Sequence, residues 1–371
     1  MGETLRLGVL FGGRSGEHEV SLVSARSVLR ALDPEKYHIT QIGIAKEGEW
    51  LVGDDVLGAL SGGSTGMLAK ATLLPMPGRS QLYTLRDEGG KEVLEVLTEL
   101  DVIIPVLHGT FGEDGTMQGL FELADLAYVG AGVLASSVGM DKGVFKDVMR
   151  AKDIPVVPYR IFLRSAFEED SEQVMDEAEG LSPYPLFVKP ANMGSSVGVH
   201  KCKDRTDLAR ALKDASRYDR RLLVEEGIEA REIELSVLGN EDPRVSIPGE
   251  IRPTAEFYSY EAKYHDDSSE LLIPAPLSDE QTKRFQELAI QAFKAIDGAG
   301  MARVDFLLDK ETDQIYLNEL NTIPGFTPIS MYPKLWEASG LEYPALIDEL
   351  ISLALERREQ RNRIVWRYER E

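Results

Sequence analysis

The sequence predicts an α/β protein whose first domain is built on a mostly parallel sheet. Three observations indicate this class. "LRLGVLFGG" at 5–13 has the pattern of a strand ending in a glycine turn, and "EHEVSLVSARSVLRAL" at 17–32 has the pattern of a helix. A second strand pattern, "YHITQIGIA", follows at 37–45. The run "DVIIPVL" at 101–107 is apolar and rich in β-branched residues, as expected of a strand buried in a parallel sheet.

Composition excludes several classes of protein. The chain has 371 residues, 43% of them hydrophobic, which is enough for two or three domains with real cores. Acidic residues outnumber basic ones by 63 to 41, and this balance disfavours nucleic acid or an anionic membrane as the main partner. The single cysteine, Cys202, excludes an intramolecular disulfide and suits a reducing compartment. With no apolar run of membrane-spanning length and no signal-peptide pattern, we expect a soluble cytoplasmic protein.

The remaining patterns predict two further units. "GDDVLGALSGGSTG" and "PMPGRSQ", between the second and third strands of the first unit, are interpreted as an irregular surface insertion. A second unit begins near Gly130, with helices at 140–153 and 168–180 and strands at 156–163, 185–190 and 197–203. A third unit is expected to carry strands at 221–228, 231–239, 244–251, 301–309 and 314–321, a helix at 278–296 and a last helix from about Tyr343 towards Arg361.

The last two strands predict a candidate metal site. A hairpin with a three-residue loop at 311–313 pairs Asp305 with Glu319 and Arg303 with Asn321, and side chains two residues apart share one face of a strand. Neighbouring carboxylates repel each other unless a cation lies between them, and ligands that are all oxygen indicate Mg²⁺. An ordinary solvated strand face with ion pairs is the alternative that this pattern leaves open.

A glycine-rich loop predicts a phosphate site. In "FVKPANMGSSVGV", Lys189 ends an apolar strand, and the loop that follows carries Gly194, Ser195, Ser196 and Gly198. Small residues let backbone N–H groups approach phosphate oxygens, and the lysine supplies positive charge. The Walker A spacing and the dinucleotide-binding "GxGxxG" pattern are both absent, so a plain hairpin turn stays open as an alternative.

Polar residues also follow the buried strand at 101–107. "VLHGTFGEDGTMQG" places His108 and Glu113 beyond the carboxyl end of that strand, where open α/β sheets bind ligands. His108 is therefore a candidate substrate-binding residue, although a single histidine at such a position is more often structural.

Several stretches together resemble the D-alanine–D-alanine ligases of the ATP-grasp superfamily. They are "FGGRSGEHEVSLVSARSV", "HGTFGEDGTMQGL", "MDK", "VKPANMGSSVGV", "EAKY", "MARVDF" and "NELNTIPGFTPISMYPKLW", and they occur in the family's order from about residue 5 to 340. The resemblance implies a three-domain ATP-grasp architecture: an N-terminal parallel α/β (pre-ATP-grasp) domain at 1–130, a central domain at 131–223 and a C-terminal domain at 224–371. It also implies a mobile lid loop at 257–276 and a homodimer formed through the N-terminal domain.

The resemblance implies roles for residues that bind ATP and metal. Two Mg²⁺ ions, for which Mn²⁺ can substitute, would be held by Asp305, Glu319 and Asn321. The phosphates would meet Lys142, Lys189, Lys263 of the lid and the loop around Ser196. Glu225 would accept from the adenine amino group, the backbone near Glu226 and Ile228 would meet the ring edge, and Glu232 would bind the ribose. Gly227 departs from the family pattern, where this position is usually bulky.

Further residues are implied to bind the amino acids. Glu17 would pair with the ammonium of the first D-alanine, in a network with Ser195 and Tyr264. Arg303 and the backbone N–H of Gly325 would form the oxyanion hole, and Ser330 would bind the carboxylate of the second D-alanine.

The activity implied is ATP-dependent ligation of two D-alanines through a D-alanyl phosphate, for peptidoglycan precursor synthesis. A D-alanine–D-lactate ligase of the same fold is the nearest alternative, and Tyr264 is the residue that discriminates between them. Two more distant classes are a different ATP-grasp ligase and a nucleotide-binding regulator with a dead site. "GEHEVS" and "PGFTPISMYP" argue against the different ligase because they fit an amino-acid site, and the complete set of expected ligands argues against the regulator.

Overall fold

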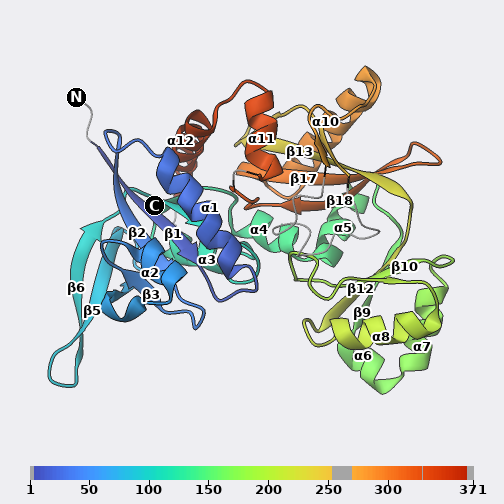
Figure 1. Cartoon of the computed structure of the whole chain (residues 1–371), viewed down its shortest axis with the longest axis horizontal. Helices are drawn as coiled ribbons and strands as arrows, with labels where there is room; N and C mark the ends of the chain where they lie inside the picture. The colour runs from blue at the N-terminus through green and yellow to red at the C-terminus, as the bar shows by residue number, and fades with distance from the viewer. Residues whose placement is uncertain (1–3, 253–269, 328, 366–371) are drawn as a thin grey trace, which may run out of the picture.

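The N-terminal part of the chain folds around an eight-stranded sheet. In the computed structural model, which describes residues 4–252, 270–327 and 329–365, the strand order of this sheet is β6-β5-β4-β3-β2-β1-β7-β8 (Figure 1). β1 (Leu5–Gly12) pairs in parallel with β2 (Tyr37–Ile44) and β7 (Val102–Val106), and β7 pairs in parallel with β8 (Ala127–Tyr128). α1 (His18–Ala31) follows β1, as predicted, and α3 (Thr116–Leu123) precedes β8. The predicted parallel strands are therefore present, but they form only half of the sheet.

The interpretation of the segment after β2 as an irregular insertion was wrong. It forms β3 (Trp50–Val52), α2 (Val56–Gly62), a 3₁₀ turn (Thr65–Met67), β4 (Ala69–Leu73), β5 (Gln81–Asp87) and β6 (Glu92–Glu99). Each strand pairs antiparallel with the one before it, from β2 out to β6. The Gly, Ser and Pro clusters fall largely in the helix and turns between these short strands. The prediction failed because turn-forming residues dominate the composition of this segment, although its short strands extend the sheet in an antiparallel direction.

A four-stranded antiparallel sheet follows in the middle of the chain, with the order β11-β10-β12-β9. Its strands are β9 (Tyr159–Leu163), β10 (Leu186–Pro190), β11 (His200–Cys202) and β12 (Arg221–Glu226). This sheet has a core of its own, to which α7 (Ser171–Glu179) and α8 (Arg205–Ala215) contribute apolar side chains. A short helix, α6 (Arg164–Glu169), precedes α7. β12, which was expected to start the third unit, belongs to this sheet, so the expected boundary at 224 falls inside a strand.

The third sheet has six antiparallel strands in the order β16-β15-β13-β17-β18, with β14 paired to β13. They are β13 (Ala230–Gly239), β14 (Arg244–Val245), β15 (Gly249–Arg252), β16 (Glu270–Leu272), β17 (Gly300–Asp309) and β18 (Ile315–Asn321). α10 (Asp279–Ala295) packs on one face together with α4 (Val133–Met140) and α5 (Lys142–Ala151), although α4 and α5 precede the middle sheet in the sequence. The other face of this sheet points into the cleft described below.

The end of the chain returns to its beginning. After α11 (Met331–Ala338), α12 (Tyr343–Asn362) packs beside α1, where Figure 1 shows the red and blue ends of the chain side by side. Leu346, Ile347 and Leu350 of α12 share one core with Leu7 and Val9 of β1. In the described part of the chain, no helix has the length and apolar character needed to cross a membrane.

Candidate active site

A cleft of about 950 Å³ lies between the middle sheet and the third sheet and reaches the ends of β1 and β7. Most of the predicted site residues line it together: Glu17, His108, Lys142, Lys189, Ser195, Ser196, Glu225, Glu226, Ile228, Glu232, Arg303, Glu319, Asn321, Gly325 and Ser330. Asp305 does not line the cleft itself but accepts a hydrogen bond from Arg303, which does. Lys263 and Tyr264 lie outside the described residues, as does most of the expected lid at 257–276, of which only the end forms part of β16.

A β-bulge brings the two predicted carboxylates into register. β17 and β18 pair Phe306 with Leu317, and then skip Asn318 to pair Asp305 with Glu319. The turn is one residue longer than predicted, because Asp309 N bonds to Gln314 O. Without the skipped residue, this turn would have placed Glu319 out of phase with Asp305. The bulge therefore restores the predicted pairing, in keeping with the frequent use of bulges to aim side chains near active sites.

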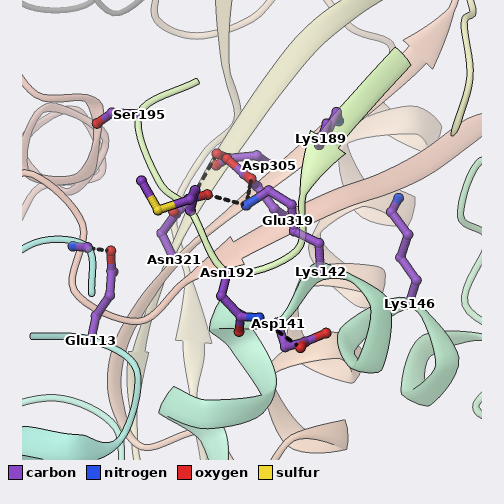
Figure 2. Close-up of polar contacts among 12 residues, drawn as sticks. Glu113, Asp141, Lys142, Lys146, Lys189, Asn192, Ser195, Asp305, Glu319 and Asn321 are labelled. Carbon is purple, nitrogen blue, oxygen red and sulfur yellow. Dashed lines mark hydrogen bonds and ion pairs between the residues drawn. The ribbon is translucent and has the colours of Figure 1, made fainter. Parts of the chain in front are cut away.

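Arg303 pairs with two carboxylates of the third sheet, and an amide contacts one of them. Its guanidinium donates to both carboxylate oxygens of Asp305, at 2.8 and 2.6 Å, and pairs with Glu234 at 3.0 Å. Asn321 Nδ2 donates to Asp305 Oδ2 at 3.0 Å, one of the contacts that Figure 2 shows. Burial opposes the charge of Arg303, but Asp305 and Glu234 raise its pKa well above the ordinary value. The guanidinium is thus a fixed, permanently charged donor in the cleft wall.

Lys142 connects the start of α5 to β18 and to the glycine-rich loop. Its Nζ lies 3.4 Å from Glu319 Oε2 and donates to Met193 O at 3.0 Å (Figure 2). Asp141 caps α5 by accepting from the backbone N–H of Val144 at 2.9 Å. Asp141 also accepts from Asn192 Nδ2 at 3.1 Å, so the helix start and the loop are fixed to each other. Lys142 therefore lies where phosphate oxygens could contact its ammonium group and, at the same time, approach Glu319 on the β17–β18 hairpin.

Two lysines hold Glu225 at the back of the cleft. Lys189 Nζ lies 2.5 Å from one carboxylate oxygen of Glu225, and Lys146 Nζ lies 2.7 Å from the other. Burial alone would raise the pKa of Glu225, but the two lysines outweigh it and lower the pKa to about 2. Glu225 is therefore an anion that can only accept hydrogen bonds, which suits the amino group of a base.

The backbone after β12 is held against the middle sheet. Gly227 N donates to Pro185 O at 2.9 Å, and a Cβ at position 227 would lie 2.6 Å from that same oxygen. This close approach excludes a side chain unless the backbone shifts, which gives a physical reason for the glycine. The neighbouring residues Glu226 and Ile228, which line the cleft, are thereby fixed in position.

The glycine-rich loop meets the N-terminal sheet at Glu17. Ser195 Oγ donates to Glu17 Oε1, a contact that joins the middle sheet to the start of α1. Both Ser195 and Ser196 have a positive φ, of 49° and 58°, which non-glycine residues adopt rarely. Backbone N–H groups in such conformations form concave anion-binding sites. The geometry therefore favours the phosphate-loop interpretation over a plain hairpin turn.

The carboxyl end of β7 carries two buried ionisable groups. His108 bonds through Nδ1 to Ile323 O at 3.1 Å and through Nε2 to Ser24 Oγ at 3.2 Å, and burial lowers its pKa. Glu113 accepts from Gly109 N at 2.8 Å, and burial together with the charge of Glu17 raises its pKa to about 8. His108 is therefore neutral and orients the loop around Ile323, while Glu113 holds a proton near neutral pH.

Replacing Glu113 with glutamine is expected to stabilise the protein at high pH. The folded state keeps the proton of Glu113 up to about pH 8, whereas the unfolded state releases it near 4.5, so folding becomes less favourable as pH rises between these values. Glutamine removes this penalty and keeps the acceptor for Gly109. The free energy of unfolding should exceed that of the wild type by a few kcal/mol at pH 8.5 and by little at pH 5. Denaturant unfolding at both pH values checks this, and an equal effect at both would contradict it.

Ser330 and Gly325 lie together at the start of α11. Ser330 Oγ accepts from Thr327 N at 3.0 Å and lies 2.7 Å from Thr327 Oγ1. A Cβ on Gly325 would lie 2.8 Å from Ser330 Oγ, so the glycine leaves room for this hydroxyl beside its own backbone. The predicted oxyanion donor and the predicted carboxylate anchor are therefore neighbours in the cleft.

Sequence reasoning missed three ionisable residues in or beside this site. Glu234 follows Glu232 at a spacing of two on β13, so strand alternation places both on the cleft face. Lys146 follows Lys142 at a spacing of four on α5, so the helix places both on one face. Glu113 was noted beyond the end of a strand but given no role. The periodicity of Glu234 and Lys146 was readable in the sequence, but no pattern indicated that these side chains are buried or which residues they contact.

Comparison with known proteins identifies the family. The family described as "D-ala D-ala ligase N-terminus" matches residues 6–131, and "D-ala D-ala ligase C-terminus" matches residues 148–352. The chain is 51% identical to the D-alanine–D-alanine ligase of Heliobacterium modesticaldum over 357 residues, 96% of each chain. This chain belongs to the D-alanine–D-alanine ligase family. The corresponding enzyme of Natranaerobius thermophilus is 48% identical and covers 97% of each chain.

Solved structures of the ligase family share the whole fold. The D-alanine–D-alanine ligase of Coxiella burnetii aligns with a TM-score of 0.81 at 39% identity, covering 97% of each chain. The VanG D-Ala:D-Ser ligase of Enterococcus faecalis aligns with a TM-score of 0.83 at 34% identity, covering 95% of this chain and 100% of the other. The family thus includes a relative named for D-serine, so acceptor choice has to be argued from the site.

The hairpin oxygens fit a hard divalent cation. In the described part of the chain, no three His, Cys, Asp or Glu side chains are grouped to hold a metal. The hairpin instead supplies two carboxylates and one amide, from Asp305, Glu319 and Asn321, which Arg303 and Lys142 neutralise in the structure. Such a donor set is what Mg²⁺ uses when substrate phosphates complete its coordination.

Proposed function

We propose that the chain joins two D-alanines into D-alanyl-D-alanine, the ligation for which its relatives are named, and that the reaction consumes ATP. The observation that carries the proposal is the contact between Ser195 and Glu17, which brings the phosphate loop and a candidate ammonium partner into one cleft. Full-length similarity to D-alanine–D-alanine ligases supports the same conclusion.

The reaction has two covalent steps. A carboxylate oxygen of the first D-alanine attacks the γ-phosphorus of ATP, and the bond from that phosphorus to ADP breaks. The amine of the second D-alanine then attacks the acyl carbon, inorganic phosphate leaves, and the amine loses a proton. Arg303 and the N–H of Gly325 stabilise the negative oxygen of the tetrahedral intermediate, since preorganised donors act strongly where charge develops.

The cleft residues position the reactants for these steps. Glu17 pairs with the ammonium of the first D-alanine, Ser330 with the carboxylate of the second, and His108 orients the substrate end of the cleft. Lys142, Lys189 and the backbone at Ser196 bind phosphate oxygens. Asp305, Glu319 and Asn321 would hold Mg²⁺, which would supply positive charge beside the transferring phosphoryl group. The nucleotide is bound by residues of the strands and turn around the back of the cleft: Glu225, Glu226, Ile228 and Glu232.

Two further proposals concern the protein in the cell. We place it in the cytoplasm, where a single buried and unpaired Cys202 is compatible with reducing conditions and where the nucleotide is available. We also propose a homodimer formed through the N-terminal domain, as the family resemblance implies. Sedimentation of the purified protein at several concentrations tests the dimer.

A phosphate-release assay tests the function directly. The purified chain with ATP and Mg²⁺ should release phosphate rapidly when D-alanine is added and far more slowly with L-alanine or with no amino acid. Mass spectrometry should identify D-alanyl-D-alanine as the product. Phosphate release that is independent of any D-amino acid would overturn the proposal.

Acceptor choice is expected to depend on Tyr264. D-lactate is the alternative second substrate, and the curated relatives, which are named for D-alanine, do not favour it. D-alanine must lose a proton to attack, whereas the D-lactate hydroxyl carries no such ammonium. With both acceptors present from about pH 7 to 9, the wild type should yield mostly the dipeptide.

Tyr264→Phe should raise the depsipeptide share several-fold, because it keeps the ring but removes the hydroxyl. The product ratio by mass spectrometry measures this, with Tyr260→Phe in the same segment as the control. A wild type that yields mostly the ester at neutral pH would reverse the choice between the two acceptors.

A further inference from the structure

A buried lysine behind the cleft has no part in the reaction proposed above, although it pairs with Glu225. Lys146 lies on α5, its side chain is 1% exposed, and its Nζ lies 2.7 Å from Glu225 Oε1. In the part of the chain that the structure describes, neither of these two atoms makes a hydrogen bond to any other group. Lys189 reaches the second oxygen of the same carboxylate from β10, and Figure 2 shows the two lysines rising from separate elements.

The three side chains differ in their access to the cleft. Glu225 and Lys189 line it, whereas Lys146 does not and approaches the carboxylate from behind. One lysine is enough to neutralise Glu225, so the cluster carries one surplus positive charge. Lys189 can therefore turn to an incoming phosphate while Lys146 keeps Glu225 paired, which a buried carboxylate requires.

We propose that Lys146 is a positioning residue for nucleotide recognition, which keeps Glu225 ionised and in place while Lys189 binds phosphate. The inference rests on the proposed function, because it takes ATP as the nucleotide. An ionised carboxylate accepts a hydrogen bond from the amino group of adenine. It repels the carbonyl oxygen that hypoxanthine carries at the same position. Lys146 would thus favour ATP over ITP without touching either.

The charges around Glu225 make this role sensitive to pH. Lys146 on α5 and Lys189 on β10 face the carboxylate directly, and the more distant Glu319 on β18 and Glu232 on β13 act on Lys189. The ring of Tyr159 on β9 lies 5.9 Å from Lys146 Nζ. Without Lys146, and with Lys189 turned to phosphate, burial would raise the pKa of Glu225 above its ordinary range. The carboxyl would then protonate as pH falls.

The test is nucleotide binding by Lys146→Met, which removes the charge and keeps much of the side-chain length. Calorimetry with Mg²⁺ would measure the Kd of a non-hydrolysable ATP analogue, and of its inosine counterpart, from about pH 6 to pH 9. The variant should bind the ATP analogue about 10-fold more weakly than the wild type near pH 6, and the difference should shrink towards pH 9. The ratio of the variant's affinities for the ATP analogue and for its inosine counterpart should decrease at low pH, because a protonated Glu225 can donate a hydrogen bond to the carbonyl oxygen of hypoxanthine.

Two controls separate this role from a structural one. Met149→Ala truncates another buried side chain of α5 and should lower stability without changing the pH profile of binding. Glu225→Gln combined with Lys146→Met removes both charges of this pair, so neither is left buried without the other. This double variant is therefore expected to fold even if Lys146→Met alone folds poorly. In the Glu225→Gln background, Lys146→Met should have almost no further effect on Kd, because the lysine acts only through Glu225.

The outcomes are distinguishable. A loss of affinity that is equal at every pH and persists in the Glu225→Gln background would overturn the proposal, as would an unchanged Kd in Lys146→Met. A wild type that neither binds the ATP analogue nor releases phosphate with D-alanine would instead overturn the proposed function.

Discussion

Replacing Arg303 with alanine is expected to lower kcat by about 10²–10³-fold, or more, while changing the KM for ATP far less. Loss of one oxyanion donor has this typical effect, and Arg303 is a charged donor that Asp305 and Glu234 hold in place. A donor fixed in advance needs no reorganisation during the reaction. Steady-state kinetics with ATP and D-alanine varied separately measures both constants.

The same substitution leaves two carboxylates without their cation. Removing one partner of a buried ion pair costs about 3–5 kcal/mol of stability, so thermal unfolding must show that Arg303→Ala is folded at the assay temperature. Arg244→Ala removes an arginine from the same sheet outside the cleft, where it pairs with Glu349, and should leave kcat within about twofold of the wild type. A variant of Arg303 that is defective only in ATP affinity would assign this residue to the nucleotide instead.

Replacing Glu319 with glutamine is expected to reduce turnover by about 10³-fold or more with the fold intact. Glu319 faces Asp305 across the hairpin and pairs with Lys142, so it supplies negative charge where the metal and the phosphates would meet. Neutralising it would remove one of the proposed metal ligands, and a metal ion beside a transferring phosphoryl group typically stabilises the transition state by several kcal/mol. Phosphate release measured over a range of Mg²⁺ concentrations checks the result.

The control for Glu319 comes from the same hairpin. Glu311→Gln makes the same change in an exposed turn residue and should not alter the rate. Circular dichroism and thermal unfolding would establish that both variants are folded. Near-normal activity of Glu319→Gln at moderate Mg²⁺ would remove this residue from the metal site.

The hairpin also shows how far strand periodicity predicts a site. The sequence predicted that Asp305 would face Glu319, and the structure pairs them, but the predicted turn was one residue too short. The bulge at Asn318 compensates for the longer turn. A bulge depends on how the two strands pair and on what each face must bury, so the pattern of either strand alone does not reveal it.

The sequence did not reveal which site residues are buried or which residues they contact. Lys146 has the pattern of an ordinary helix residue, and only the folded structure shows that its Nζ lies beside Glu225 of β12. The assignment of β12 to the third unit failed for a related reason. Its pairing with β9 and β10 is a contact between segments far apart in the chain, and local patterns do not encode it.

The position of α12 has a consequence for how the protein is made. Leu346 and Ile347 of this helix complete the core on one side of the N-terminal sheet, yet they are translated long after the strands that they cover. The middle sheet, with its self-contained core, can close early in translation. One apolar face of the N-terminal strands stays uncovered until α12 has emerged from the ribosome. During synthesis this protein therefore presents a hydrophobic surface that chaperones would recognise and that its finished form conceals.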